Sequence, residues 1–165
     1  MEHTKFTVII PTRERCETLY HTLRTCVDQR YENLEIIVSD NCSRDDTKAV
    51  VSSFNDARIR YISTGRRVSM TENFEFGLSH VRDGFLMFIG DDDGLLPEAV
   101  KRANAIVHEH GVKAVMSGTC LYVWPNHPDV GRRNSISWPA SSTVEIRNAA
   151  EWINKVLTFE PVYVF

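Results

Sequence analysis

The sequence predicts an α/β fold, with a mostly parallel sheet that carries helices on both faces. Short apolar runs alternate along the chain with segments whose apolar residues follow a helical period. The runs are hydrophobic almost throughout, which is typical of parallel strands covered on both sides. Three of the runs lead into polar segments. These should meet at one edge of the sheet, because right-handed crossovers bring the carboxyl ends of parallel strands together.

The first half of the chain alternates regularly between strand and helix patterns. The run KFTVII has the pattern of a strand and ends at Pro11. The next segment has apolar residues at i, i+4, i+7 and i+8, as on one face of a helix. In order, we predict a strand at 5–10, a helix at 18–29, a strand at 34–38, a loop at 39–46, a short helix at 47–54, a strand at 58–62 and a helix at 70–81.

The second half begins with an apolar run between Gly84 and Gly90, which predicts a buried strand. Pro97 fits the first turn of a helix that stops at Gly111. In order, we predict a strand at 85–90, a helix at 97–111, a long strand at 113–124, a loop at 125–142 and a helix at 144–157. The apolar run 160–165 looks like the start of another strand, so we expect one domain, truncated at its C-terminal side.

Composition excludes several classes of protein. The 165 residues suggest one domain with a core of ordinary size. The net charge of −3 gives no basic field for nucleic acid. No apolar stretch approaches the roughly 18 residues of a membrane span, and no signal peptide is evident. The four cysteines have no CxxC spacing, so free thiols in a reducing cytoplasm are expected, and attachment to the inner face of a membrane stays open.

Three consecutive aspartates, Asp91, Asp92 and Asp93, follow the strand at 85–90. Ligands of open α/β sheets bind at the carboxyl ends of the strands. Three like charges repel, and Mg²⁺ or Mn²⁺ carrying a phosphate group would offset them with the hard oxygen ligands it prefers. Such an ion could neutralise charge on a departing nucleotide. The alternative is a solvated acidic loop that caps the following helix.

Other polar residues at the same edge are candidates for nucleotide contacts. Asp40 follows the strand at 34–38 and could accept from a base N–H, although its neighbours also favour a plain turn. Arg13, Arg15, Arg66 and Arg67 could bind a diphosphate, although arginine more often serves solubility. The absence of GxGxxG and GxxxxGK[ST] disfavours a dinucleotide site and a P-loop.

Three segments, in this order, resemble the family 2 glycosyltransferases of the GT-A fold: VIIPTRERCETLYHTLRTCVDQRY, LEIIVSDNCSRDDT and NFEFGLSHVRDGFLMFIGDDDGLLP. They cover roughly residues 5–110. The resemblance implies a Rossmann-like GT-A sheet, a UDP- or dTDP-sugar donor, inversion at the anomeric carbon, and Mg²⁺ or Mn²⁺. It also implies a glycan or lipid-linked acceptor in cell-envelope polysaccharide synthesis. Residues 1–165 would then be one nucleotide-sugar-binding domain that lacks part of its acceptor side.

The resemblance also assigns roles to individual residues. Asp40 falls where the family contacts the base, and Asp92, five residues before Pro97, matches the metal-binding carboxylate. Asp91 matches its ribose-side neighbour, and Asp93 supports the metal. The predicted nucleotide-binding residues are Pro11, Thr12, Arg13, Arg15, Asp40, Arg67 and Asp91, and the predicted metal-site residues are Asp92 and Asp93.

The chain departs from the family pattern at two positions of the site. Gly90 stands where many members have an aspartate, and Arg13 replaces a frequent aromatic, so a guanidinium would stack on the base. The family places its catalytic base well downstream. The acidic residues of the tail, Glu145, Glu151 and Glu160, carry no matching motif, so none is assigned. We therefore expect this chain to bind donor but to transfer sugar poorly.

Two other classes stay open as alternatives. A nucleotidyltransferase also places metal-binding aspartates beside a nucleotide, but it would normally carry a glycine-rich basic loop after its first strand, and PTRER has no glycine. A non-catalytic nucleotide-binding or regulatory module, such as a receiver-like domain, would need acidic residues after its first strand. Here that strand ends in Pro11, Thr12 and Arg13.

Overall fold

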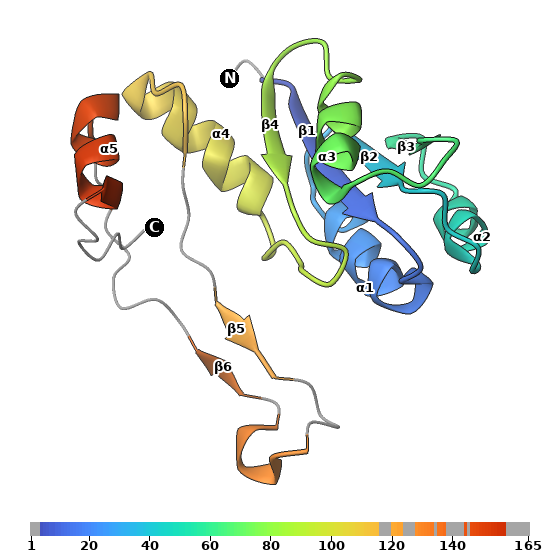
Figure 1. Cartoon of the computed structure of the whole chain (residues 1–165). Coiled ribbons are helices and arrows are strands. Elements are labelled where there is room, and N and C mark those ends of the chain that lie inside the picture. Colours follow the sequence, from blue (N-terminus) through green and yellow to red (C-terminus); the bar gives the residue numbers. More distant parts are fainter. Residues whose placement is uncertain are drawn as a thin grey trace. The chain divides into compact units, whose positions relative to one another are not determined.

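The computed structural model describes residues 4–115, 120–123, 128–133, 135–137, 144 and 146–157. The chain forms two compact units, Met1–Ala105 and Ile106–Phe165, and each is described by itself. In chain order, the first part consists of β1 (Phe6–Thr12), α1 (Cys16–Val27), β2 (Leu34–Asp40), α2 (Thr47–Ser53), β3 (Ile59–Ser63), α3 (Met70–Leu78), β4 (Phe85–Phe88) and α4 (Ala99–His110), the last of which runs on into the second unit (Figure 1).

The first unit is built on a four-stranded parallel sheet with the strand order β3-β2-β1-β4. Ile9 of β1 stands beside Ile37 of β2 on one side and beside Phe88 of β4 on the other. Because all four strands run the same way, their carboxyl ends share one edge. The predicted α/β fold with a mostly parallel sheet is therefore confirmed.

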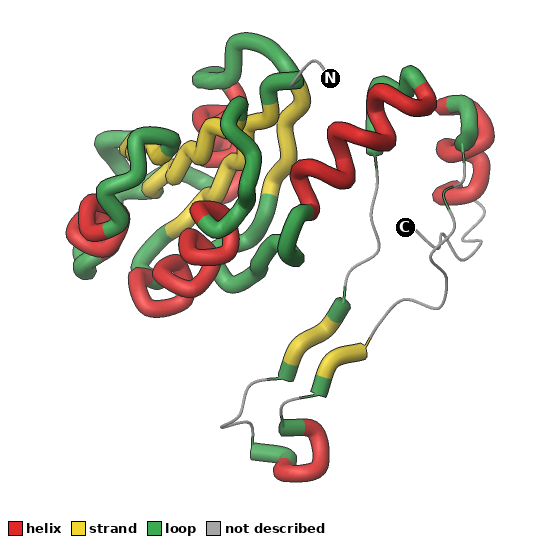
Figure 2. The backbone as a smooth tube through the Cα atoms, turned by 180° about the vertical axis from the view of Figure 1, so that it is seen from behind, coloured by secondary structure: helices red, strands yellow, loops and turns green. Residues whose placement is uncertain are grey.

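Helices cover both faces of this sheet. Alternate residues of β1, Val8 and Ile10, pack with Leu19 and Leu23 of α1 in the main core. That core also includes Val51 of α2 and Val100 of α4. Figure 1 shows α3 over one face, and Figure 2 shows α1 and α2 from the opposite side. Full burial of one Leu or Ile contributes about 2 kcal/mol, so this face carries much of the stability.

The far side of the sheet is held partly by polar contacts. Asn73 of α3 is buried and exchanges two hydrogen bonds with Ser39 at the end of β2. The Ser39 hydroxyl donates to Asn73 Oδ1 at 2.8 Å, and Asn73 Nδ2 donates to the Ser39 carbonyl at 3.0 Å. At the start of α3, Ser69 and Glu72 form a reciprocal capping box. These contacts fix α3 against the strand that carries Asp40.

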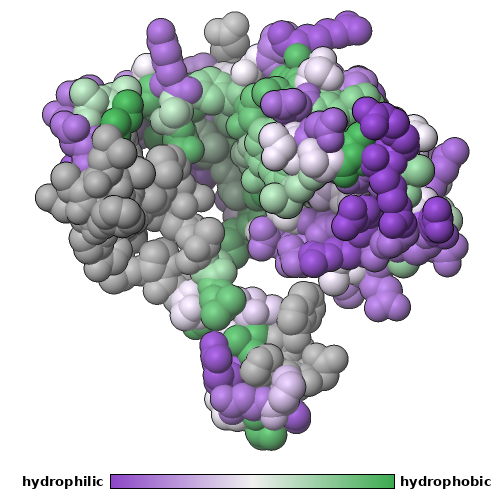
Figure 3. All heavy atoms as spheres, viewed as in Figure 1, coloured by the Kyte–Doolittle hydropathy of each residue, from purple (hydrophilic) through white to green (hydrophobic). Residues whose placement is uncertain are grey.

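The strand before the aspartates is less buried than its sequence predicts. Among the described residues, β4 pairs only with β1, so it is an edge strand. Phe85 and Met87 pack against the core, whereas Leu86 and Phe88 are 40% and 37% exposed. The ring of Phe88 lies 5.0 Å from that of Phe74 on α3. None of the four residues of β4 is fully buried, so the prediction of a buried strand is wrong, and Figure 3 shows hydrophobic side chains at the surface over this strand.

The described part of the second unit is small, and it corrects two predictions. Beyond α4, its elements are β5 (Leu121–Tyr122), η1 (Val130–Arg132), β6 (Ile136–Ser137) and α5 (Ala149–Leu157). The long strand predicted at 113–124 is wrong, because residues 113–115, 120 and 123 lie outside β5. The predicted loop at 125–142 contains η1 and β6. An apolar run forms a strand only where it finds a partner, and β5 pairs with only two residues of β6.

The last predicted helix begins later than its apolar period suggests. Asn148 accepts from the Glu151 amide at 3.0 Å, and Glu151 accepts from the Asn148 amide at 3.1 Å, so α5 starts at Ala149 rather than near residue 144. The strand start expected at 160–165 lies outside the described residues. Among the helices that the structure describes, none combines the length and apolar character needed to cross a membrane.

Candidate functional site

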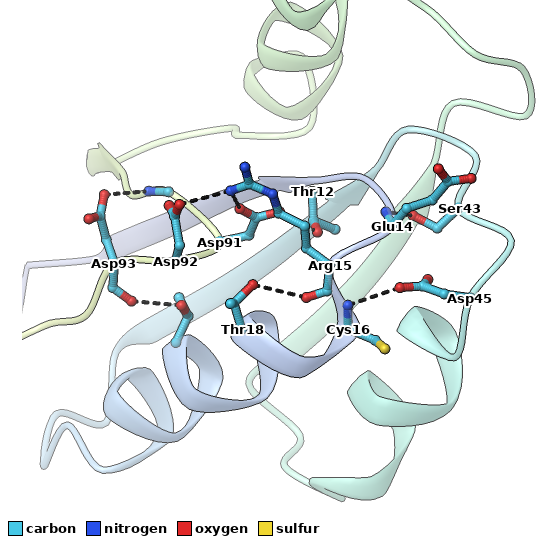
Figure 4. A network of polar contacts seen from close by, with 12 residues as sticks. Thr12, Glu14, Arg15, Cys16, Thr18, Ser43, Asp45, Asp91, Asp92 and Asp93 are labelled. Carbon is cyan, nitrogen blue, oxygen red and sulfur yellow. Dashed lines mark hydrogen bonds and ion pairs between the residues drawn. The ribbon is translucent and has the colours of Figure 1, made fainter. Parts of the chain in front are cut away.

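Loops from three strands meet at the carboxyl edge of the sheet, as the sequence predicts. Thr12 and Asp40 are register partners at the ends of β1 and β2. The Thr12 hydroxyl donates to Asp91 Oδ2 at 2.7 Å, across 79 positions of sequence. The Glu14 amide donates to Ser43 Oγ at 2.8 Å, which joins the loop after β1 to the loop after β2. These bonds hold the three loops in a single polar network (Figure 4).

Arg15 lies between two of the three aspartates. Its Nη1 atom is 3.1 Å from Asp91 Oδ1 and 2.8 Å from Asp92 Oδ2. Hydrogen bonding to Asp91 and the charges of both carboxylates raise the pKa of Arg15 above its usual value. The side chain of Asp91 is only 9% exposed, whereas those of Arg15 and Asp92 are 54% and 55% exposed. Asp91 is therefore the fixed member of this group.

The third aspartate points elsewhere. Asp93 accepts from the Gly90 amide at 3.1 Å through its carboxylate, and from Thr22 Oγ1 at 2.6 Å through its carbonyl (Figure 4). A Cβ on Gly90 would lie 2.8 Å from carboxylate oxygens of both Asp92 and Asp93. A side chain at position 90 would therefore displace one or both of these carboxylates. The metal role of Asp93 stays a prediction.

The donor set suits a divalent cation only in part. Within the described residues, no group of three or more His, Cys, Asp and Glu side chains is arranged to hold a metal ion. However, Asp91 Oδ1 and Asp92 Oδ2 both contact one cationic nitrogen, so two carboxylates already face a common positive charge. Mg²⁺ and Mn²⁺ are often held by one or two carboxylates, with phosphate and water oxygens as the other ligands. The Asp91–Asp92 pair fits that requirement.

Asp40, predicted to contact the base, is buried and already has several donors. Its Oδ1 accepts from the Ser43 amide at 3.1 Å and from the Ser43 hydroxyl at 2.5 Å. Its Oδ2 accepts from the Tyr61 hydroxyl at 2.5 Å. Burial, followed by the bond to Asp40, raises the pKa of Tyr61 above its usual value. Asp40 thus fastens its own loop to β3, and its contact with a base stays a prediction.

The remaining predicted residues lie around the same edge. Pro11 is half-buried at the end of β1, and Arg13 is exposed beyond it. Arg67 forms an ion pair with Glu14, which ties the loop after β3 to the loop after β1. Whether Pro11, Arg13 and Arg67 contact a nucleotide stays a prediction.

Four residues that sequence reasoning did not single out hold this site together. Glu14 pairs with Arg67. The Asn41 amide group exchanges two 2.8 Å hydrogen bonds with the backbone of Val68 and so anchors the loop that carries Arg67. Ser43 and Tyr61 hold Asp40 in place. The spacing of Asp40 and Ser43 is a recognisable turn signal, but the Tyr61 and Val68 contacts depend on strand pairing.

Asp45 joins the starts of two helices beside the site, and this leads to a test. Its Oδ2 accepts from the Cys16 amide of α1 at 2.9 Å, and its Oδ1 accepts from the Thr47 amide and hydroxyl of α2 at 3.2 and 2.5 Å. This distant cap explains why α1 begins at Cys16 rather than at residue 18. Burial alone would raise the pKa of Asp45, but the hydrogen bonds from Thr47 and Cys16 outweigh it and lower the pKa below its usual value.

We expect Asp45→Ala to lower the free energy of unfolding by about 1.5 kcal/mol at pH 7, as for a lost helix cap. A folded pKa below the unfolded one means that the stabilisation is complete above the unfolded pKa, about 4, and is lost as pH falls through the folded value. The difference in free energy of unfolding between Asp45→Ala and wild type, measured with urea, should therefore be constant between about pH 7 and 5. It should become smaller below about pH 4.

Asp46→Ala is the matched control for this cap. Asp46 is the neighbouring residue and the N-cap position of α2, yet its side chain makes no capping hydrogen bond. We expect it to change the free energy of unfolding by less than about 0.5 kcal/mol at any of these pH values. Equal losses in the two variants would contradict the capping role of Asp45.

Comparison with known proteins matches this chain to one family. The family model of glycosyl transferase family 2 matches residues 7–159. The chain is 37% identical over 120 residues to a GalNAc(5)-diNAcBac-PP-undecaprenol beta-1,3-glucosyltransferase of Campylobacter jejuni, covering 71% of this chain and 38% of that protein. It is 33% identical over 129 residues to a validoxylamine A glucosyltransferase of Streptomyces hygroscopicus, covering 73% and 30%. The match thus spans only 38% and 30% of the length of these two relatives.

Solved structures agree on the fold. Staphylococcus aureus TarS (residues 1–349) in complex with UDP-GlcNAc superimposes with a TM-score of 0.59 at 25% identity, covering 65% of this chain and 32% of that one. A mannosyltransferase from Pyrobaculum calidifontis, in complex with GDP-Man and Mn²⁺, has a TM-score of 0.58 at 20% identity, covering 79% and 38%. The family match extends over most of the 165 residues, so this chain belongs to glycosyl transferase family 2.

Proposed function

We propose that this chain is the donor-binding portion of an inverting, metal-assisted glycosyltransferase that uses a UDP- or dTDP-sugar. The observation that carries the proposal is the convergence of Asp91 and Asp92 on one cationic group beside the loops after β1 and β2. Membership of glycosyl transferase family 2 supports the reaction class. The likeness to TarS, solved with UDP-GlcNAc, supports a uridine nucleotide as donor.

In the proposed mechanism, residues of this chain bind the metal ion and the nucleotide. Thr12 donates to Oδ2 of Asp91 and so leaves Oδ1 to Arg15, which also contacts Asp92. Asp91 and Asp92 would hold Mg²⁺ or Mn²⁺, which gives Asp91 a metal contact in addition to the ribose-side position predicted from the sequence, and Asp93 would support the metal site. When bound, the ion supplies positive charge that stabilises the leaving diphosphate. The nucleoside would contact Pro11, Thr12, Arg13 and Asp40. The phosphates would contact Arg15 and Arg67, because the guanidinium fork matches phosphate oxygens.

For the acceptor we propose only a chemical class. The Campylobacter relative is named for an acceptor that carries PP-undecaprenol. We therefore propose a glycan or lipid-linked acceptor in cell-envelope polysaccharide synthesis, and a cytoplasmic location at the inner face of the membrane. No residue of this chain is assigned as the base that deprotonates the acceptor hydroxyl. The chain should accordingly bind donor more readily than it transfers sugar.

A thermal-shift titration tests the donor proposal. UDP and MnCl₂ are added separately and together to the purified chain. A ligand that binds only the folded state, and is present at a concentration about 100 times its Kd, stabilises that state by about 2.7 kcal/mol. We expect a rise of several degrees in Tm with both ligands, and a smaller rise with either alone. No change in Tm with UDP, dTDP or GDP, with or without metal, would refute nucleotide binding.

A further inference from the structure

We infer that Arg15 is a built-in counter-ion of Asp91 and Asp92, which a divalent metal must displace and which a nucleotide diphosphate then receives. Arg15 would thereby couple metal binding to nucleotide binding at the same site. The inference rests on the proposed function and adds a positioning role for one residue of this chain.

The contacts of Arg15 make it a direct competitor of the metal. A single nitrogen, Nη1, bonds to Asp91 Oδ1 at 3.1 Å and to Asp92 Oδ2 at 2.8 Å. These are the oxygens that would face a divalent ion. Such an ion would stand within roughly 4 Å of the guanidinium charge if Arg15 stayed, and two cations that close repel strongly. Arg15 and the metal cannot both use this pair.

The arginine side chain can leave while its backbone stays fixed. The Arg15 carbonyl accepts from the Leu19 amide at 3.0 Å and from the Thr18 hydroxyl at 3.2 Å, which anchors the residue at the start of α1. Its side chain is 54% exposed, and so is free of tight packing. Asp91, by contrast, is held by Thr12 at 2.7 Å. Displacement of Arg15 therefore requires side-chain rotation and leaves the carboxylates in place.

A diphosphate changes the cost of this displacement. Without nucleotide, the metal must break the Arg15 contacts, and the guanidinium gains only water. With a diphosphate bound at the metal, Arg15 gains phosphate oxygens, which match its fork of N–H donors. Each ligand then strengthens the other, and the coupling is reciprocal. Arg67, at the same edge, pairs with Glu14 rather than with these two aspartates.

The test is Mn²⁺ binding to the full chain, measured from the electron paramagnetic resonance signal of free Mn²⁺, with and without UDP. For Arg15→Gln, we expect Mn²⁺ affinity without UDP to rise about fivefold, the upper range for loss of an exposed ion pair. The enhancement of Mn²⁺ affinity by UDP should shrink at the same time. Arg24→Gln, which removes the same charge from an exposed position on α1, is the control and should behave as wild type.

The two arms of the experiment separate this inference from the proposed function. If Arg15→Gln binds Mn²⁺ as tightly as wild type, or less tightly, in the absence of UDP, then Arg15 does not compete with the metal. Failure of the wild type to bind UDP would overturn the proposed function, while the nucleotide-free comparison would still decide whether Arg15 competes with the metal. If Arg24→Gln raises the Mn²⁺ affinity as much as Arg15→Gln does, the rise comes from net charge alone, and the inference is overturned.

Discussion

Asp92→Asn is expected to weaken UDP binding in the presence of Mn²⁺ by about 100-fold, the upper range for disturbed metal sites. The substitution keeps the shape of the side chain but removes the negative charge that contacts Arg15. The Asp92 side chain is 55% exposed, and exposed ion pairs contribute little to stability. The free energy of unfolding should therefore change by less than about 0.5 kcal/mol. Isothermal titration calorimetry and urea unfolding measure the two quantities.

Asp93→Asn is the matched control, because it is the same change at the next residue. Its carboxylate accepts from the Gly90 amide, and an asparagine carbonyl can still do so. We expect it to bind UDP and Mn²⁺ within about threefold of wild type. Full binding by Asp92→Asn would exclude the proposed metal role of that residue. A loss in Asp93→Asn as large as in Asp92→Asn would instead support the metal role that the sequence predicts for Asp93.

Gly84→Ala is expected to lower the free energy of unfolding by about 3 kcal/mol, because strain and overlap add there. Gly84 has φ of 84° immediately before β4. A Cβ there would overlap the carbonyl oxygen of Lys5 and lie 2.9 Å from Lys5 Cβ. The same carbonyl accepts from the Phe85 amide at 2.9 Å, the bond that starts the pairing of β4 with β1. Urea unfolding with fixed m-value measures the loss.

Gly65→Ala separates strain from overlap. Gly65 also has a left-handed φ, 71°, but an added Cβ there would meet nothing within 4 Å. Its cost should be only that of the conformation, about 1 kcal/mol. Equal losses at both glycines would show that the approach of Lys5 does not matter. Gly84→Ala should lower the free energy of unfolding more than Gly65→Ala does. It should also weaken UDP binding, because β4 leads into the three aspartates.

Local pattern was sufficient for most elements of the first unit. Strand and helix periods are properties of neighbouring residues, so β1, β2 and the helix that became α1 could be read from the sequence. The shared edge followed from the handedness of crossovers. The same reasoning was wrong for the strand at 113–124, and for the burial of β4, because both depend on which other segment lies alongside.

Local sequence thus determined the fold class, the order of the first unit's elements and the loops that meet at their carboxyl edge. Tertiary structure alone decided how those polar residues pair: Arg15 with Asp91 and Asp92, Asp93 with Gly90, and Asp40 with Tyr61. The physical reason is range. Backbone patterns arise within a few residues, whereas a hydrogen bond or ion pair depends on distances of about 3 Å between groups many positions apart, which only the packed sheet sets.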